Sequence, residues 1–564
     1  MNTFLGRPDL KPTHPNDVQP GLNKIVVATV HYGHQEMIME KDVPVPMRDG
    51  ITLYVNVFRP DKPGTFPVVM SADAYGKDTK AFFDSVRPLW PTIGVIPASD
   101  FTPMESPDPG FWVPNEYVVI KVAVRGSSNS EGALHPWSAL EAQDYYDVIE
   151  WAGVQQWSNG NVGTNGVSYL SVTQWLVAAL NPPHLKAMIP WEGLNDIYRE
   201  FAFHGGIPNT GFFRTWVHQM KARWPQNKEV EDLISEQQEH PLLDEFWEQR
   251  RPTLTNITVP MFVCASWSTQ GLHNRGSFEG FKQAASKDKW LEVHGRKEWE
   301  YYYSREVLER QKLFFDCFLK GIENDWRDRP RVRLEVRERF FQGQIRFENE
   351  WPIARTTYTK LYLDGEAMTL QSPPPRQETE LTYHAEPDGT ENNELRFQMT
   401  FQENTELIGY MKLRLWVATN DTDDMDLFVG VKKYDRRGEE VYLADFNHIE
   451  WGQVATGWLR VSHRELDPER STPSQPWLKH KRVLKLNKGE IVPVDIEILP
   501  SGTLFKAGER LVLVVKGSEI ITKGSSPQYG VTGYEHKETV NKGTHLMYAG
   551  GKYDSFLLVP VIAS

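Results

Sequence analysis

Hydrophobic and polar positions follow two different patterns along this chain, and the change falls near residue 330. Upstream of it, short apolar runs of strand length alternate with longer stretches whose apolar positions recur with helical spacing. The strand-like runs cover residues 67–70, 117–122, 162–167, 184–190, 259–265 and 289–294, and the helical stretches cover 139–154, 171–180 and 305–319. Strands that alternate with helices build a parallel sheet with helices on both faces, so a doubly wound α/β domain is predicted.

Two segments precede or interrupt this alternation. Residues 36–60 contain two alternating runs around a central turn, which predicts a β-hairpin, and residues 1–35 are expected to form an N-terminal arm. Residues 192–254 are helix-like and rich in aromatic side chains. Because this insertion follows a central strand, we expect it to cover the site as a helical lid. The α/β domain is then made of residues 36–191 and 255–328.

The second pattern, over residues 329–564, consists of short alternating segments separated by turn residues. The segments lie at 331–336, 359–363, 409–417, 425–432, 483–486, 492–498 and 510–515. No long helical stretch interrupts them. Repeated short strands of this kind are typical of an antiparallel β-sandwich, here expected to be jelly-roll-like.

Composition narrows the class of protein and its surroundings. A length of 564 residues is too long for one ordinary core, and a net charge of −13 works against nucleic acid or an anionic membrane as a partner. The chain has no apolar stretch long enough to span a membrane and no signal-peptide pattern in residues 1–21. Its two cysteines, Cys264 and Cys317, lie in apolar runs and are predicted to be buried free thiols. A cytoplasmic protein is expected.

The strongest local signal for chemistry is Gly166-Val167-Ser168-Tyr169, placed between a predicted strand and a predicted helix. A serine at such a sharp turn projects its hydroxyl above the sheet, with the helix N-terminus ready to stabilise negative charge. The usual Gly-x-Ser-x-Gly motif has a second glycine, where this chain has Leu170. Taken alone, the tetrapeptide is equally compatible with a serine that only caps a helix.

The residues around this serine carry a wider resemblance. The matching segments are residues 74–77, 125–132, 142–151, 156–163, 166–170, 413–417 and 457–460. Together they resemble the cocaine esterase / X-Pro dipeptidyl-peptidase (S15) family, of the CocE/NonD type, which includes the α-amino acid ester hydrolases. The resemblance runs from about residue 40 to the C-terminus. It implies an α/β-hydrolase fold with a C-terminal β-sandwich.

The family resemblance also implies roles for single residues. Ser168 corresponds to the nucleophile, and the backbone N–H of Tyr169 and the hydroxyl of Tyr75 correspond to the oxyanion hole. The catalytic aspartate of the family corresponds to Thr269. Threonine has no charge to stabilise an imidazolium, and loss of that charge costs about 10⁴-fold in turnover in a Ser-His-Asp triad.

The histidine is also displaced from the family pattern. Glu298 stands at the family's histidine position, and His294 lies four residues earlier, at the end of a predicted strand. We predict His294 as the general base, with His273 as the competing candidate. Glu298 or Glu300 could orient His294 in place of the missing aspartate. Alternatively, the serine and His294 act as a dyad on a reactive ester, lactone or thioester, or the site has been altered by evolution or engineering.

The expected activity is therefore that of a serine hydrolase or acyltransferase. The substrate is expected to be an ester, lactone, thioester or amide of a small hydrophobic molecule, cleaved through an acyl-enzyme on Ser168. The alternative is a non-hydrolytic cyclase, rearrangement enzyme or binding protein, because of Thr269; a binding role for the β-sandwich is a third possibility.

Neither a cofactor nor a metal is expected. The acidic run Asp421–Asp426 lacks the glycine and final glutamate of a calcium loop, and no Cys/His group has zinc spacing. Besides a small-molecule acyl substrate, the only partner that the composition suggests is a second copy of the chain in a homodimer.

Overall fold

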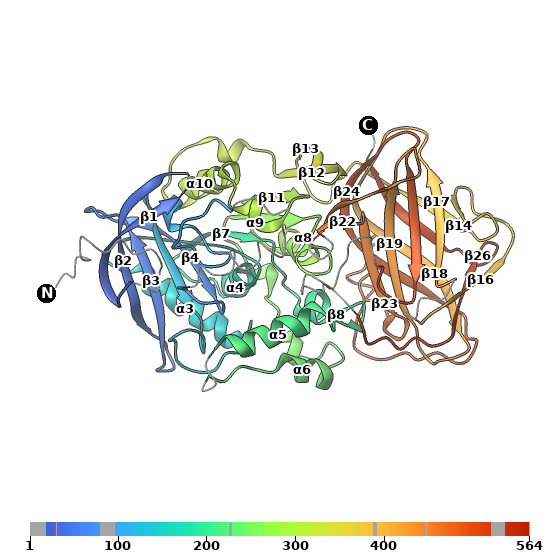
Figure 1. Ribbon diagram of the computed structural model, residues 1–564, viewed down its shortest axis with the longest axis horizontal. Coiled ribbons are helices and arrows are strands. Elements are labelled where there is room, and N and C mark those ends of the chain that lie inside the picture. Colours follow the sequence, from blue (N-terminus) through green and yellow to red (C-terminus); the bar gives the residue numbers. More distant parts are fainter. Residues whose placement is uncertain are drawn as a thin grey trace.

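The computed structural model describes residues 18–29, 31–78, 96–224, 228–386, 392–445, 449–520 and 536–562. Residues 1–17 of the predicted arm lie outside this part. The chain forms an α/β half and an all-β half, with the insertion beside the place where they meet (Figure 1). This arrangement confirms the predicted fold class.

One mixed sheet forms the centre of the α/β half. Its strands lie in the order β1-β2-β3-β5-β4-β6-β7-β10-β11-β12-β13. They are β1 (Gly21–Thr29), β2 (Gly33–Pro46), β3 (Thr52–Arg59), β4 (Phe66–Asp73), β5 (Val118–Ala123), β6 (Ser158–Val167), β7 (Leu185–Trp191), β10 (Met261–Ser266), β11 (Lys289–His294), β12 (Val332–Arg339) and β13 (Gln342–Glu348). The strands from β5 to β12 in this order are parallel, so the carboxyl ends of β4, β6, β7, β10 and β11 meet at one edge.

Strand β1 is an addition to the predicted elements. It lies in the segment expected to be an arm, and it pairs with β2 along its whole length in an antiparallel register. Alternate side chains of β1, including Ile25 and Val27, are buried. The arm therefore extends the sheet at its edge.

Helices cover the sheet on both faces, as in a doubly wound fold. They include α2 (Pro109–Trp112), α3 (Ala139–Gly153), α4 (Tyr169–Ala178), α8 (Asn274–Gln283), α9 (Glu298–Tyr302) and α10 (Arg305–Leu319). The strands they cover are buried on both faces: every residue of β4, β5 and β10 is buried. This explains why these strands appear in the sequence as continuous apolar runs.

The insertion after β7 is built of short pieces. A single turn of π-helix (Tyr198–Ala202) leads to the two-residue strands β8 (Phe203–His204) and β9 (Ile207–Pro208). The helices α5 (Phe212–Arg223), α6 (Leu233–Glu239) and α7 (Glu245–Glu248) follow, and Figure 1 shows α5 and α6 beside the α/β half and close to the second half.

The C-terminal half is an antiparallel β-sandwich with its own core. Its strands are β14 (Thr356–Asp364), β15 (Thr369–Gln371), β16 (Thr379–His384), β17 (Glu394–Thr400), β18 (Thr405–Thr419), β19 (Asp426–Tyr434), β20 (Glu440–Val441), β21 (Leu443–Asp445), β22 (Ile449–Gly452), β23 (Ala455–Arg460), β24 (Val492–Phe505), β25 (Arg510–Lys516), β26 (Thr544–Ala549) and β27 (Phe556–Ile562). Strand β18 pairs with β24, β26 and β27, while β25 pairs with β17 and β19 in the facing layer. The two halves are joined where Arg337 of β12 pairs with Thr503 of β24.

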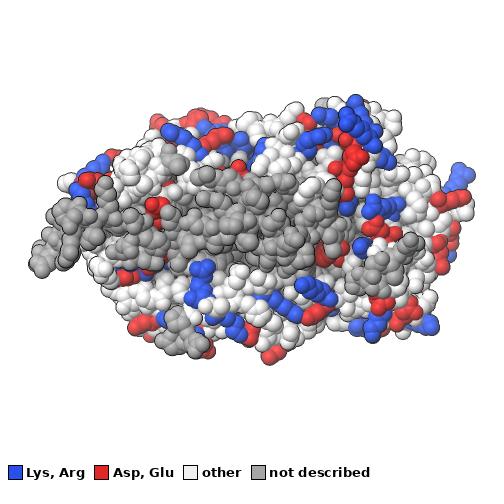
Figure 2. All heavy atoms as spheres, in the orientation of Figure 1, with Lys and Arg blue, Asp and Glu red and all other residues white. Residues whose placement is uncertain are grey.

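The surface charges, the helices and the two cysteines can each be compared with the expectations from composition. Figure 2 shows basic and acidic side chains interspersed over the described part of the visible face. Among the described helices, none has the length and apolar character needed to cross a membrane. Cys264 is buried and Cys317 is partly buried, and both are free thiols.

Candidate active site

Ser168 lies in a strained turn between β6 and α4. Its backbone has φ 58° and ψ −118°, in a region that residues other than glycine rarely occupy. Gly166 allows this turn: its φ is 150°, and a Cβ there would lie 2.6 Å from the Cβ of Leu170. The side chain of Leu170, at the place of the missing second glycine, therefore packs into the space that Gly166 leaves. Ser168 is partly exposed, while Val167 and Tyr169 on either side are buried.

Backbone hydrogen bonds connect the turn at Ser168 to the end of the neighbouring strand β7. The N–H of Ser168 is shared between the carbonyl oxygens of Trp191, at 3.1 Å, and Glu192, at 3.0 Å. Both acceptors lie at the carboxyl end of the neighbouring strand β7. The strained serine is thus tied to the sheet edge, as the predicted nucleophile requires.

Tyr75 follows β4 and reaches the same edge. The Asp73 carboxylate accepts hydrogen bonds from the backbone N–H of Tyr75, at 2.7 Å, and of Gly76, at 3.0 Å, which fixes the loop. The phenol oxygen of Tyr75 accepts from the indole N–H of Trp216 at 3.1 Å, and its ring packs edge-on against Tyr169. Burial raises the pKa of the Tyr75 hydroxyl well above its usual value, so the phenol stays a neutral donor.

Ser168 opens into a small, mostly aromatic cavity. The residues that line it are Tyr75, Trp137, Ser168, Tyr169, Val172, Leu194, Phe201, Phe212, Trp216, Leu272 and His273. Three aromatic side chains come from the insertion, which supports its predicted place over the site. Among the described residues that line the cavity, no carboxylate, lysine or arginine is present.

The histidine that shares this cavity with Ser168 is His273, the competing candidate. His273 follows the loop after β10 and directly precedes α8. The predicted base, His294, is held elsewhere: its Nε2 lies 2.7 Å from the Glu192 carboxylate, and its Nδ1 accepts a hydrogen bond from the Arg296 N–H at 3.1 Å. Its ring also stacks on Tyr301 with centroids 4.0 Å apart. Both ring nitrogens of His294 are therefore occupied, and this residue does not line the serine cavity.

Glu298 is the partner of His273. It is the first residue of α9, and its Oε1 lies 3.1 Å from Nδ1 of His273, with both side chains buried. The two atoms are within ion-pair distance but are not aligned as a hydrogen bond, and Glu298 accepts none from the described residues. Burial, with the nearby Glu192 charge, raises the pKa of Glu298 well above its usual value. Burial lowers the pKa of His273 to about 4, and the charge of Glu192 opposes this shift.

Thr269, which stands where the family has its catalytic aspartate, forms a hydrogen bond of its own. Its hydroxyl donates to the Glu192 carboxylate at 3.1 Å, so the position is filled by a donor that faces an anion. Glu192 was not among the predicted site residues. The signal that could have found it is its place directly after the strand 185–191, at the edge where the other site residues gather. Glu300, the other predicted orienting acid, is partly buried on α9.

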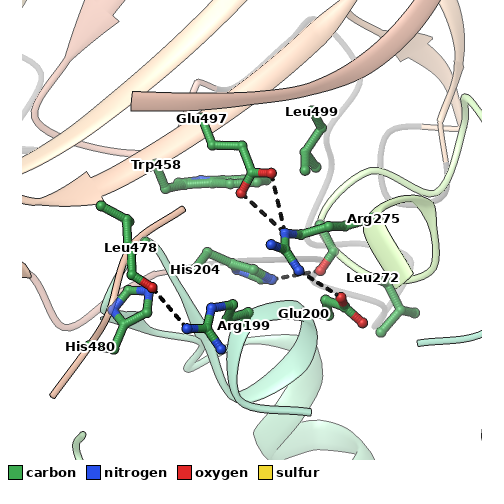
Figure 3. Close-up of a pocket in the computed structure, with 12 residues that line it drawn as sticks. Arg199, Glu200, His204, Leu272, Arg275, Trp458, Leu478, His480, Glu497 and Leu499 are labelled. Atoms are coloured by element: carbon green, nitrogen blue, oxygen red, sulfur yellow. Dashed lines mark hydrogen bonds and ion pairs between the residues drawn. The ribbon is translucent and has the colours of Figure 1, made fainter. Parts of the chain in front are cut away.

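The β-sandwich and the insertion hold the loop that carries His273. The side chain of Gln270 accepts from the Thr456 N–H at 2.8 Å and donates to the Val454 carbonyl at 3.1 Å. Figure 3 shows Arg275 between Glu200 of the insertion and Glu497 of the sandwich. The two ion pairs measure 3.0 Å and 3.1 Å, and Arg275 stands two residues after His273 in the chain. A second small cavity lies among these three parts of the chain.

Among the described residues, two groups whose side chains could ligate a metal ion include Glu192. One consists of Glu192, His273 and Glu298, and the other of Glu192, Cys264 and His294. Burial raises the pKa of the Cys264 thiol well above its usual value, which keeps it protonated and makes it a poor ligand. In the first group, the two glutamates lie beside His273, which lines the serine cavity.

A strained serine at a strand-to-helix turn, on a doubly wound sheet and beside a buried histidine, defines the class of α/β-hydrolases that act as serine hydrolases. The comparisons with known proteins specify the family. Residues 49–297 match the X-Pro dipeptidyl-peptidase (S15) family, and residues 324–558 match the X-Pro dipeptidyl-peptidase C-terminal non-catalytic domain. A CocE/NonD family hydrolase from Staphylococcus aureus has a crystal structure that is 62% identical, covers 99% of this chain and 100% of its own, and superimposes with a TM-score of 0.95. The chain belongs to the CocE/NonD family of hydrolases.

More distant relatives share the same architecture. The cocaine esterase of Rhodococcus sp. (strain MB1 Bresler) is 25% identical over 92% of this chain and 98% of that enzyme. An α-amino acid ester hydrolase structure is 17% identical, covers 93% of this chain and 96% of its own, and has a TM-score of 0.70, which shows a shared fold. The protein is thus a serine hydrolase of a family that cleaves esters and amides.

Proposed function

We propose that the protein hydrolyses esters of small, uncharged, hydrophobic acids through an acyl-enzyme on Ser168, with His273 as general base and Glu298 as its acid partner. The observation that carries the proposal is that His273 lines the serine cavity while Glu298 lies 3.1 Å behind its Nδ1. This replaces His294, whose two ring nitrogens are already occupied.

The reaction follows from these positions. Nε2 of His273 removes the proton from the Ser168 hydroxyl as the oxygen attacks the ester carbonyl. The Tyr75 hydroxyl and the Tyr169 N–H donate to the oxyanion that forms. When the C–O bond breaks, His273 returns the proton to the leaving alcohol. A water then attacks the acyl-serine with the same base, which releases the acid and restores the serine.

This acid–base pair exchanges the two loops of the family pattern. The family resemblance places the acid after the strand that is β10 here and the histidine after β11. In this chain the histidine follows β10 and the acid begins α9 after β11. The exchange is chemically neutral because both loops leave the same sheet edge, and a triad depends on geometry rather than on chain order.

The walls of the cavity favour a neutral acyl group. Trp137, Phe201 and Trp216 pack against one another, with Trp137 and Trp216 stacked at 4.8 Å between centroids. A substrate ammonium would lose its water there without meeting a carboxylate among the described lining residues, which costs several kcal/mol. We therefore expect neutral esters to be preferred over X-Pro peptides and amino-acid esters.

Labelling with a fluorophosphonate probe tests the proposal, alongside hydrolysis of nitrophenyl esters. The native protein is expected to label and to turn over acetyl and benzoyl esters, and Ser168→Ala and His273→Gln are expected to lose both activities. His218→Gln is the matched control, because His218 is an exposed histidine on α5. Labelling that survives in His273→Gln but is lost in His294→Gln would return the base to His294. A native protein that never labels would favour the non-hydrolytic alternative.

A further inference from the structure

We propose that Glu192 is a second carboxylate of the acid–base apparatus, a positioning residue that holds the nucleophile turn and stabilises the imidazolium of His273 together with Glu298. This inference rests on the proposed function. It assigns a role to a residue that lies outside the triad of the family pattern.

The backbone of Glu192 joins the nucleophile turn to the strand that leads to His273. Its carbonyl accepts the Ser168 N–H at 3.0 Å, and its own N–H donates to the Cys264 carbonyl of β10 at 2.8 Å. Glu192 has φ 43°, a value uncommon for a residue with a side chain. Strain of this kind persists where surrounding contacts impose it, and it is concentrated at functional sites.

The Glu192 side chain is fully buried and is held by two donors. Oε1 accepts from Nε2 of His294 at 2.7 Å, and Oε2 accepts from the Thr269 hydroxyl at 3.1 Å. Because Nδ1 of His294 accepts the Arg296 N–H, the proton of this neutral ring lies on Nε2 and points at the carboxylate. Each oxygen of the Glu192 carboxylate thus faces one hydrogen-bond donor.

This fixed charge lies beside the proposed acid–base pair. One nitrogen of His273 and one oxygen each of Glu192 and Glu298 lie within 4.8 Å of one another. When His273 takes the serine proton, its positive charge forms beside the Glu192 carboxylate and the Glu298 carboxyl group inside a buried site. Attraction at this distance is much stronger there than in water, so a transition state with imidazolium character is stabilised.

Other charged groups lie further along the same cluster. Burial and the neighbouring Glu298 raise the pKa of Glu105 well above its usual value, and Lys297 opposes the rise in the pKa of Glu298. The guanidinium of Arg275 is neutralised by Glu200 and Glu497. His204 lies 2.6 Å from the Gly271 carbonyl, and burial lowers its pKa to about 3, so it remains neutral. Glu192 and Glu298 each have a carboxyl oxygen within 4.8 Å of a ring nitrogen of His273.

The same arrangement explains why position 269 is a threonine. An aspartate there would place a second anion where Thr269 now donates to Glu192 at 3.1 Å. The negative charge that the family has at this position is supplied by Glu192 instead, and the threonine serves as one of its two donors.

Steady-state kinetics of Glu192→Gln on a neutral ester, measured as a function of pH, test the proposal. We expect kcat to fall about 10- to 100-fold with KM within about twofold of the native value, since the lost interaction acts mainly in the transition state. We also expect the acidic limb of kcat/KM to move to lower pH. A nearby negative charge raises the proton affinity of the His273–Glu298 pair, so its removal lowers both apparent pKa values of that pair.

A residue that only buttresses the loops would lower kcat without moving the acidic limb, and that result would overturn the proposal. Unchanged kcat would overturn it as well. If Glu192→Gln does not fold, Thr269→Val replaces it, because this change removes one donor to Glu192 and keeps the carboxylate. Thr269→Ser, which keeps the hydroxyl, is its matched control, and equal kinetics of Thr269→Val and Thr269→Ser would contradict the proposal.

Failure of this inference is distinguishable from failure of the proposed function. Fluorophosphonate labelling that depends on Ser168 and His273 establishes the nucleophile and the base without reference to Glu192. Loss of that dependence would refute the proposed function itself.

Discussion

The turn at Ser168 and the loops after β10 and β11 differ in what determines their structure. The turn around Ser168 is local: Gly166, the serine and the start of α4 lie within a few residues, and its geometry follows the family pattern despite Leu170. The loops after β10 and β11 depart from that pattern in the proposed site, where the histidine follows β10 and the glutamate follows β11. A strained backbone turn tolerates little change in sequence, whereas side chains that only need to meet in space can come from either loop.

Among the variants that test the turn and the two loops, Glu298→Gln is expected to have the largest effect on kcat. If the exchanged pair forms the triad, removal of the acid charge should lower kcat by about 10³- to 10⁴-fold, as loss of the aspartate does in other triads. Glu298→Asp should recover part of the activity, because the charge remains but lies further from His273. Stopped-flow and steady-state assays of ester hydrolysis measure both. Activity of Glu298→Gln within threefold of the native protein would exclude the exchanged triad.

Tyr75→Phe tests the proposed oxyanion hole beside Ser168. Loss of one oxyanion donor is expected to lower kcat by about 10²- to 10³-fold with little change in KM, because the donor acts on charge that appears only in the transition state. Trp216→Phe removes the indole N–H that donates to the Tyr75 oxygen and should have a smaller effect. If Tyr75→Phe changes KM alone, Tyr75 binds substrate and is no oxyanion donor.

Thr269→Asp tests whether the acid position of the family pattern is vacant in this chain. A vacant acid position would be repaired by this change, and turnover would rise. We expect the opposite, a decrease of about 10-fold in kcat, because the new carboxylate would face Glu192 across a distance of about 3 Å in a buried site. Thermal unfolding should show a lower Tm for this variant than for Thr269→Ser. Faster hydrolysis by Thr269→Asp would show that an aspartate at position 269 can still act as the triad acid, as in the family pattern.

The smallest effect is expected from Glu497→Gln in the β-sandwich. This change weakens one of the two ion pairs that hold Arg275 next to the His273 loop. A decrease of about 2- to 5-fold in kcat is expected, corresponding to about 0.4–1 kcal/mol of positioning energy. Lys485→Gln, which affects an exposed ion pair of the same domain, provides the control. Equal effects of the two variants would mean that the sandwich does not position the base.

Much of the fold was predictable because its signals are local. Buried parallel strands appear as short apolar runs, and the amphipathic spacing of residues 139–154 and 305–319 marks the helices α3 and α10. Strand β1 was not predicted, because its pairing with β2 at the sheet edge gives it only alternate burial over a short segment. The sharp turn at Ser168 was also predictable, since it depends on neighbouring residues.

The identity of the base depends on contacts between distant residues. His294 ends one predicted strand and His273 lies in the loop after another, and the carboxyl ends of both strands share one edge, so local pattern does not show which histidine meets the serine. The contact that removes His294 from the cavity joins it to Glu192, 102 residues away in the chain. Glu192 itself was passed over because it stands at the first position of the predicted insertion.

The sequence by itself therefore determined the α/β sheet, the β-sandwich and the serine turn, since backbone conformation and burial follow from short-range periodicity and from glycine placement. Only the tertiary structure decided which histidine and which glutamate meet. The two histidines and the two glutamates come from the carboxyl ends of three strands, β7, β10 and β11, at one edge of the sheet. Which carboxylate each histidine meets depends on side-chain distances of about 3 Å that no spacing along the chain encodes.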